Sequence, residues 1–173
     1  RELETLLCPH LDFLYGVAFR LTGMQADAED LVQEVLLKLY PKYSKLAAIE
    51  KIRPWLAKVT YRTFIDHKRR YQRSPFSLLK STSSSEETNP VDTLASDNPG
   101  PAQMVENKFT SRDLQAALNM LNEEQRAVCV LHDIEGYSLP ELEDILTTPL
   151  GTLKSGLHRA RASLKKIIKH GTF

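Results

Sequence analysis

GTLKSGLHRAR, residues 151–161, is the stretch that decides the fold of this chain. Winding it as a helix at about 100° per residue gathers one apolar stripe that continues downstream: Leu153, Leu157, Ala160, Leu164, Ile167 and Ile168. The polar side chains Lys154, Ser155, His158 and Arg159 fall on the opposite side. A helix with one buried face and such a polar face can lie in the major groove of DNA.

The segment before it predicts a partner helix. Ser138-Leu139-Pro140-Glu141 is a capping box, in which Ser138 caps the helix and Glu141 reaches back. An apolar run through Leu146 follows, and residues 147–149 form a turn. Together the two segments predict a helix-turn-helix; the alternative is an ordinary amphipathic hairpin with a solvated basic face.

Charge is unevenly distributed along the chain, although the net charge is only +1. Cations far outnumber the single carboxylate, Asp66, between Lys51 and Arg73, and residues 147–173 contain no carboxylate at all. Two separate basic segments, each on a predicted helix, are typical of a protein that holds nucleic acid at two points. A solvated surface is the simpler explanation for either segment alone.

The rest of the chain predicts helices throughout. Apolar residues recur at helical spacing over residues 11–21, and Gly23 stands where a helix ends. Asp27 is expected to cap a helix over residues 28–40, and Pro54 to open another that runs to Tyr71. Helical spacing returns from Val105, with no convincing strand pattern anywhere. The predicted fold class is therefore all-α.

Residues 74–101 interrupt the helical pattern. A run of serine and threonine, several prolines and mostly acidic charges predict a flexible acidic linker. We therefore expect two small helical domains, residues 1–73 and residues 102–173, that sample many separations in solution. The second domain contains the helix-turn-helix.

The two cysteines, Cys8 and Cys129, are too few for a disulfide framework, which favours a reducing cytosol. The Cys129–His132 spacing has the look of a metal ligand pair, but its apolar helical setting favours a structural thiol, so we predict no metal site and no cofactor. No signal peptide or long apolar span is evident. Because the chain starts at Arg1 rather than Met, part of the native N-terminus is expected to be missing.

Taken in order, these motifs resemble the extracytoplasmic-function (ECF) sigma factors of bacterial RNA polymerase, which belong to group IV of the sigma-70 family. The matching segments are residues 28–35, 55–70, 121–126 and 151–161. The resemblance implies that residues 1–73 are sigma region 2, which binds core polymerase and recognises and melts the −10 element. Residues 102–173 would be region 4, which recognises the −35 element.

Each predicted surface has its own residues. The polymerase-binding surface comprises Asp30, Gln33, Glu34 and Leu37, an acidic and amide-bearing helix face with an exposed leucine. The −10 surface comprises Lys58, Tyr61, Arg62, Lys68, Arg69 and Arg70, where cations would hold phosphates and tyrosine would stack on an unpaired base unless it is packed. The −35 surface comprises Thr152, Lys154, Ser155, His158 and Arg159.

Three residues depart from the family pattern. Arg62 stands where asparagine is common, Glu143 where a small alanine is usual, and Gly156 where an arginine usually follows Lys154-Ser155. A glycine inside a helix also costs about 1 kcal/mol relative to alanine. These departures are compatible with weaker binding to the −35 element or with an unusual promoter sequence.

The resemblance also implies partners: the β′ clamp and β flap of core RNA polymerase, promoter DNA, and an anti-sigma factor that could hold the protein at the inner membrane. We expect a cytoplasmic protein that is monomeric when free of partners, with no small-molecule substrate. The main alternative is a stand-alone helix-turn-helix transcriptional regulator, which would not need the Asp30 docking face. An enzyme is disfavoured, because the sequence contains no phosphate-binding glycine loop and no recognisable catalytic constellation.

Overall fold

The computed structural model describes residues 2–74 and 109–170, and within them the chain forms helices and no strands. The first half contains α1 (Glu2–Leu7), α2 (Leu11–Thr22), α3 (Gln25–Leu39), α4 (Tyr43–Leu46) and α5 (Ile52–Arg73), with single 3₁₀ turns at Cys8–His10 and Tyr40–Lys42. The second half contains α7 (Ser111–Asn119), α8 (Glu123–Cys129), a π-helical segment (Val130–Ile134), α9 (Leu139–Leu146) and α10 (Leu150–His170). The all-α prediction is confirmed.

In the first half, α2 and α3 form a helical hairpin against which α5 packs. Gly23 ends α2 in the left-handed region at φ 78°, and its N–H donates to the carbonyl of Phe19, as the sequence predicted. The buried side chains come from all three helices and include Leu14, Leu21, Leu31 and Phe64. These side chains are the first half's part of an apolar core that continues into the second half.

The predicted start of α3 was wrong. Asp27 lies inside the first turn of the helix, which begins at Gln25 after Met24, and no side chain caps its N-terminus. Gly23 alone reverses the chain, so α3 starts directly after the turn and Asp27 contributes only a negative charge near the helix N-terminus.

In the second half, side-chain caps define where the helices begin. Ser138 and Glu141 form the predicted capping box of α9, and Thr110 and Asp113 form a second one on α7. Asn122 accepts a hydrogen bond from the backbone of Gln125 at the start of α8. These caps satisfy backbone N–H groups that would otherwise have no partner within their helices.

The helix-turn-helix is present as α9 and α10. Thr147 ends α9 in the left-handed region at φ 54°. The buried stripe of α10 consists of Leu153, Leu157 and Ala160, whereas the predicted member Ile168 is 44% exposed. Leu164 and Ile167, two other predicted members of the stripe, are partly buried against the core.

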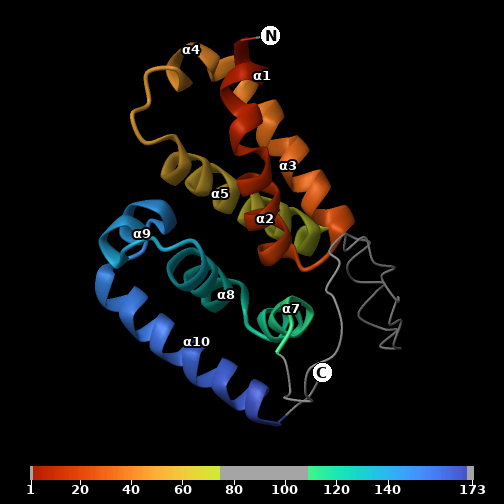
Figure 1. The fold of residues 1–173 in the computed structure, drawn as a ribbon, viewed down its shortest axis with the longest axis vertical. Coiled ribbons are helices and arrows are strands. Elements are labelled where there is room, and N and C mark those ends of the chain that lie inside the picture. Colours follow the sequence, from red (N-terminus) through yellow and green to blue (C-terminus); the bar gives the residue numbers. More distant parts are fainter. Residues whose placement is uncertain (1, 75–108, 171–173) are drawn as a thin grey trace, which may run out of the picture.

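The two halves pack against one another (Figure 1), with α5 beside α9 and the end of α2 beside α7 and α8. The buried guanidinium of Arg126 on α8 donates to the carbonyl of Leu21 on α2 at 2.6 Å. Gly23 lies so close to Asn119 that a side chain there would collide with it. The structure thus shows one closed arrangement where the sequence predicted freely moving domains; most of the predicted linker lies outside the described residues.

Candidate functional site

The predicted −10 surface lies on α5, and the second half contacts part of it. Lys58 donates to Asp144 of α9 at 2.8 Å, and Lys68 pairs with Glu123 of α8 at 3.3 Å. Arg62, between them, donates to the hydroxyl of Thr147 at 3.4 Å. These three of the five cations that the sequence assigned to promoter DNA are therefore hydrogen-bonded or ion-paired to the second half.

The remaining two cations of that surface behave differently. Arg69 is exposed, and within the described residues it forms no ion pair. Arg70 donates to Glu34 of α3 at 2.6 Å, which ties the end of α5 to the middle of α3. The six predicted −10 residues thus share one helix, but they do not form one free surface.

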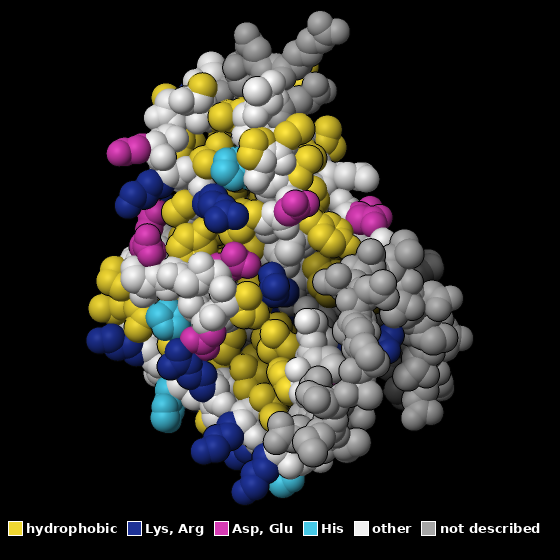
Figure 2. Space-filling model, in the orientation of Figure 1, with side chains coloured by type: hydrophobic (Ala, Val, Ile, Leu, Met, Phe, Trp, Pro, Cys, Tyr) yellow, Lys and Arg dark blue, Asp and Glu magenta, His cyan; other side chains and the backbone are white. Residues whose placement is uncertain are grey.

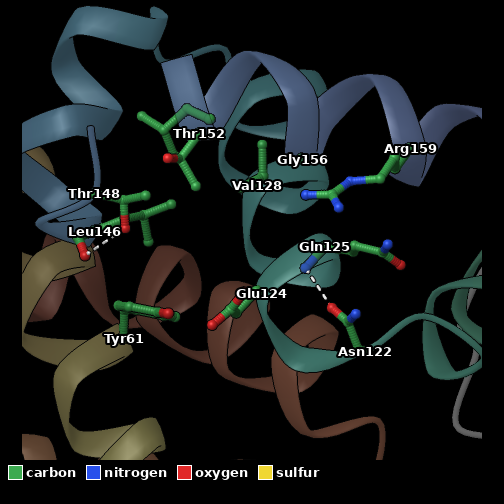
Figure 3. Close-up of a pocket in the computed structure, with 11 residues that line it drawn as sticks. Tyr61, Asn122, Glu124, Gln125, Val128, Leu146, Thr148, Thr152, Gly156 and Arg159 are labelled. Carbon is green, nitrogen blue, oxygen red and sulfur yellow. Dashed lines mark hydrogen bonds between the residues drawn. The ribbon is translucent and has the colours of Figure 1, made fainter. Parts of the chain in front are cut away.

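Tyr61 lies between the halves, at a pocket of about 250 Å³. Figure 3 shows Tyr61 lining this pocket from α5 while Arg159 reaches into it from α10. Burial raises the pKa of the Tyr61 hydroxyl, and the negative charge of Glu124 raises it further. In this arrangement Tyr61 packs as a half-buried ring and is not presented to solvent for stacking.

The predicted −35 surface lies on α10, where Thr152 and Arg159 also line the pocket between the halves. All five of its residues are exposed: Thr152, Lys154, Ser155, His158 and Arg159. Figure 2 shows Lys and Arg side chains following the lower edge of the molecule, where Figure 1 draws α10. The expected separation of a polar outer face from a buried stripe is therefore present on this helix.

One of the three unusual residues, Glu143, acquires a structural explanation. The Glu143 carboxylate accepts a hydrogen bond from the backbone N–H of Leu150 at 3.3 Å, so it caps the N-terminus of α10. Gly156 has open space around the position of a Cβ atom, so packing does not require glycine there. The glycine lines the pocket between the halves, beside Thr152 and Arg159.

The predicted polymerase-binding face on α3 is exposed only in part. Asp30 and Gln33 are exposed, and Leu37 is 75% exposed despite being a large apolar residue. Tyr40, one helical turn farther on and 74% exposed, extends this face; the spacing of three from Leu37 was the signal that could have revealed it.

Glu34, predicted to share that exposed face, is half-buried and turned toward α5. Its carboxylate contacts Lys38 at 3.0 Å, His67 at 2.7 Å and Arg70 at 2.6 Å. Burial would raise the pKa of the Glu34 carboxyl, but hydrogen bonds from Lys38 and Arg70 outweigh it and lower the pKa. Glu34 thus connects α3 to α5 and is the least accessible member of the predicted set.

The two cysteines lie in unlike settings. Cys129 is 2% exposed, and burial raises the pKa of its thiol to about 11, whereas Cys8 is exposed. His132 is engaged with the carbonyl of Tyr137 at 2.7 Å. Across residues 2–74 and 109–170 no group of three or more His, Cys, Asp or Glu side chains could hold a metal ion. None of the described helices is long and apolar enough to cross a membrane.

Two models of known protein families match this chain. Residues 6–74 match the family model for sigma-70 region 2, and residues 111–164 match that for sigma-70 region 4. The chain belongs to the sigma-70 family. The two matched segments contain α2 to α5 and all the helices of the second half up to the middle of α10.

The relatives of this sigma-70 chain include several ECF sigma factors, which confirms the resemblance seen in its motifs. It is 34% identical to the ECF RNA polymerase sigma factor SigE of Mycolicibacterium smegmatis, over 98% of this chain and 63% of the relative. It is 27% identical to the ECF sigma factor SigW of Bacillus subtilis, over 91% of this chain and 84% of the relative. The chain thus spans less than two thirds of the SigE relative.

A solved structure supports the packed arrangement of helices. The sigma factor RpoE from Bartonella quintana, crystallised with the anti-sigma factor NepR, superposes with a TM-score of 0.71 at 28% identity. The superposition covers 94% of both chains, so it includes both halves.

Proposed function

We propose that this sigma-70 chain is a promoter-specificity subunit that binds core RNA polymerase and directs it to −10/−35 promoters. The observation that carries the proposal is the coexistence of two exposed surfaces of different chemistry. One is the polar face of α10 with Lys154, Ser155 and His158; the other is the α3 face with Asp30 and Leu37. The first suits a DNA groove, and the second suits a protein partner.

A stand-alone helix-turn-helix regulator explains only the α10 face. It gives no reason for Leu37 and Tyr40 to remain about three quarters exposed beside Asp30 and Gln33. An apolar pair rimmed by polar groups is typical of a protein–protein interface. We propose the β′ clamp of polymerase as the partner of this face, and the β flap as a partner of region 4.

Regulation by an anti-sigma factor is the next part of the proposal. The Bartonella quintana structure contains RpoE in complex with NepR, and this chain superposes on RpoE over nearly its whole length. We propose a comparable anti-sigma partner for this chain, acting in the cytoplasm or at the inner membrane. Without partners the chain is a monomer, and RNA synthesis belongs to the core enzyme.

Reconstitution with core polymerase tests the function. Purified chain and core enzyme are run together on a sizing column, and the complex then transcribes fragmented genomic DNA. We expect a stable complex, and RNA 5′ ends that share sequence elements upstream at −10 and −35. Binding to DNA without any association with the core enzyme would instead establish the stand-alone regulator.

The α10 face yields a graded prediction. Arg159→Ala should weaken −35 binding by about 1–3 kcal/mol if its guanidinium reads a base edge. Lys154→Ala should weaken binding to all sequences alike and reduce the salt dependence if it contacts phosphate. Fluorescence anisotropy with a promoter found by the transcription experiment measures both effects.

Lys42→Ala is the matched control, because it removes one exposed cation from the other half of the molecule. Wild-type affinity for both α10 variants, with the control unchanged, would mean that another face reads the promoter.

A further inference from the structure

The pocket of about 250 Å³ beside Tyr61 plays no part in the proposed function. Tyr61 lines it from α5, and the other lining residues belong to the second half, where α8, the end of α9 and α10 meet (Figure 3). Pockets that bind drug-sized molecules usually have volumes of about 300–1,000 Å³. The size of this pocket therefore suits a smaller metabolite.

The walls of the pocket carry two opposite charges. Glu124 contributes a carboxylate from the first turn of α8, and Arg159 contributes a guanidinium from α10. Within residues 2–74 and 109–170 neither side chain makes an ion pair or a hydrogen bond, with the other or with any third group. A ligand that carries both a positive and a negative charge offers each of them a partner.

The rest of the lining is apolar with a few polar groups. Val128, Leu146 and Leu153 are buried side chains that line the pocket. The hydroxyl of Thr152 and the carboxamide of Gln125 lie on the same walls as the two charges. Buried apolar side chains with a small number of convergent polar groups are typical of small-molecule sites.

Gly156 keeps this pocket open. It lines the pocket from the same helix face as Thr152 and Arg159, and a Cβ atom built on it has no heavy atom within 4 Å. Its φ is not positive, so the backbone does not require glycine there either. Since glycine inside a helix costs about 1 kcal/mol relative to alanine, the absence of a side chain is explained by the space that it leaves for a ligand.

We propose that the pocket binds a free amino acid with an apolar side chain. The ammonium group of the amino acid pairs with Glu124, and its carboxylate pairs with Arg159. Its side chain lies against Val128, Leu146 and Leu153. A purely anionic metabolite would place negative charge beside Glu124, and a purely cationic one would place positive charge beside Arg159, so a zwitterion fits this lining better than either.

Binding of the amino acid has a consequence for DNA recognition. Arg159 belongs to the −35 surface, so the amino acid and −35 DNA compete for one guanidinium. Because coupling between two ligands is reciprocal, each weakens the binding of the other. This consequence rests on the proposed function, whereas the binding of the amino acid does not.

The first experiment titrates the whole chain with L-leucine in a calorimeter at neutral pH. N-acetyl-L-leucine and L-leucinamide have the same side chain, but each lacks one of the two charges. We expect both derivatives to bind at least about tenfold more weakly than L-leucine, because each leaves one charge of the pocket without a partner. Equal binding by the derivatives would overturn the proposal. So would the absence of binding by L-leucine, L-methionine and L-phenylalanine at concentrations up to about 10 mM.

The second experiment fills the pocket from Gly156. Gly156→Gln should weaken L-leucine binding by at least about tenfold, because the new side chain occupies the space of the ligand. Gly151→Gln is the matched control: Gly151 also lies on α10 with open space around its Cβ position, but it does not line the pocket. It should bind L-leucine within about twofold of wild type. Both substitutions favour the helix, so unfolding does not account for a loss of binding. Equal affinities of the two variants would overturn the site.

The third experiment repeats the anisotropy measurement on promoter DNA with saturating L-leucine. We expect binding of the DNA to weaken about threefold in the wild type and to stay unchanged in Gly156→Gln. Unchanged DNA binding in the wild type would overturn the competition and leave the site standing.

Calorimetry uses the chain alone, so its result is independent of core polymerase. If no amino acid binds while the transcription experiment is positive, the pocket proposal fails by itself. If L-leucine binds as expected but no polymerase complex forms, the proposed function fails and the amino-acid site stands.

Discussion

Arg126→Met should lower the free energy of unfolding by about 3 kcal/mol, because it removes a buried, charged hydrogen-bond donor group. The Arg126 guanidinium is wrapped in carbonyl groups, which belong to Leu21, Leu118, Asn119 and Leu121. Methionine fills a similar volume but leaves these acceptors without their donor. Chemical denaturation followed by circular dichroism measures the loss.

Arg161→Met is the matched control. Arg161 makes an exposed ion pair with Asp133, so the same substitution there should change stability by less than about 1 kcal/mol. Equal effects at the two positions would show that the guanidinium of Arg126 contributes no more than a surface charge. A drop at Arg126 alone would establish it as the polar centre of the second half.

Leu37→Asp should weaken the complex with core polymerase by about 50-fold while leaving thermal unfolding nearly unchanged. The leucine side chain is 75% exposed, so the folded chain loses little when it is replaced. A carboxylate at the centre of an apolar contact would be desolvated without a partner when the complex forms. Titration of labelled core enzyme measures the affinity.

Met120→Asp is the control for this prediction, because Met120 is a 56% exposed apolar residue in the other half. It should leave polymerase binding within about twofold of wild type. If Leu37→Asp binds as well as wild type does, the α3 face is not the docking surface. Charge reversal at Asp30 gives a cleaner companion test than at Glu34, whose ion pairs to α5 would be broken at the same time.

The sequence predicted correctly those features that depend on interactions between residues close together in the chain. The capping box at Ser138 and Glu141, the glycine turn at Gly23 and the buried stripe begun by Leu153 depend only on neighbours within a few residues. Such patterns determine where helices begin and which face is apolar. They also located the polar face of α10 correctly.

The contacts between the halves escaped prediction, because they join residues separated by much of the chain. Nothing near Arg126 in the sequence indicates that its guanidinium reaches Leu21. Within the first half, Lys38 is a local i,i+4 partner of Glu34, but His67 and Arg70 are distant in the sequence and were not predicted. The prediction that Asp27 caps α3 was wrong for a different reason. An acidic residue is common both as a helix cap and in the first turn, and the residue type alone does not distinguish the two positions.

The different accessibility of the Cys129 and Cys8 thiols is useful for measuring conformational changes of this protein. A buried thiol with a pKa of about 11 is scarcely ionised at pH 8, so alkylating reagents attack the exposed Cys8 first. A fluorophore can therefore be placed on Cys8 without any substitution. The slower modification of Cys129 then measures local opening, because its rate reports how often α8 opens enough to admit the reagent.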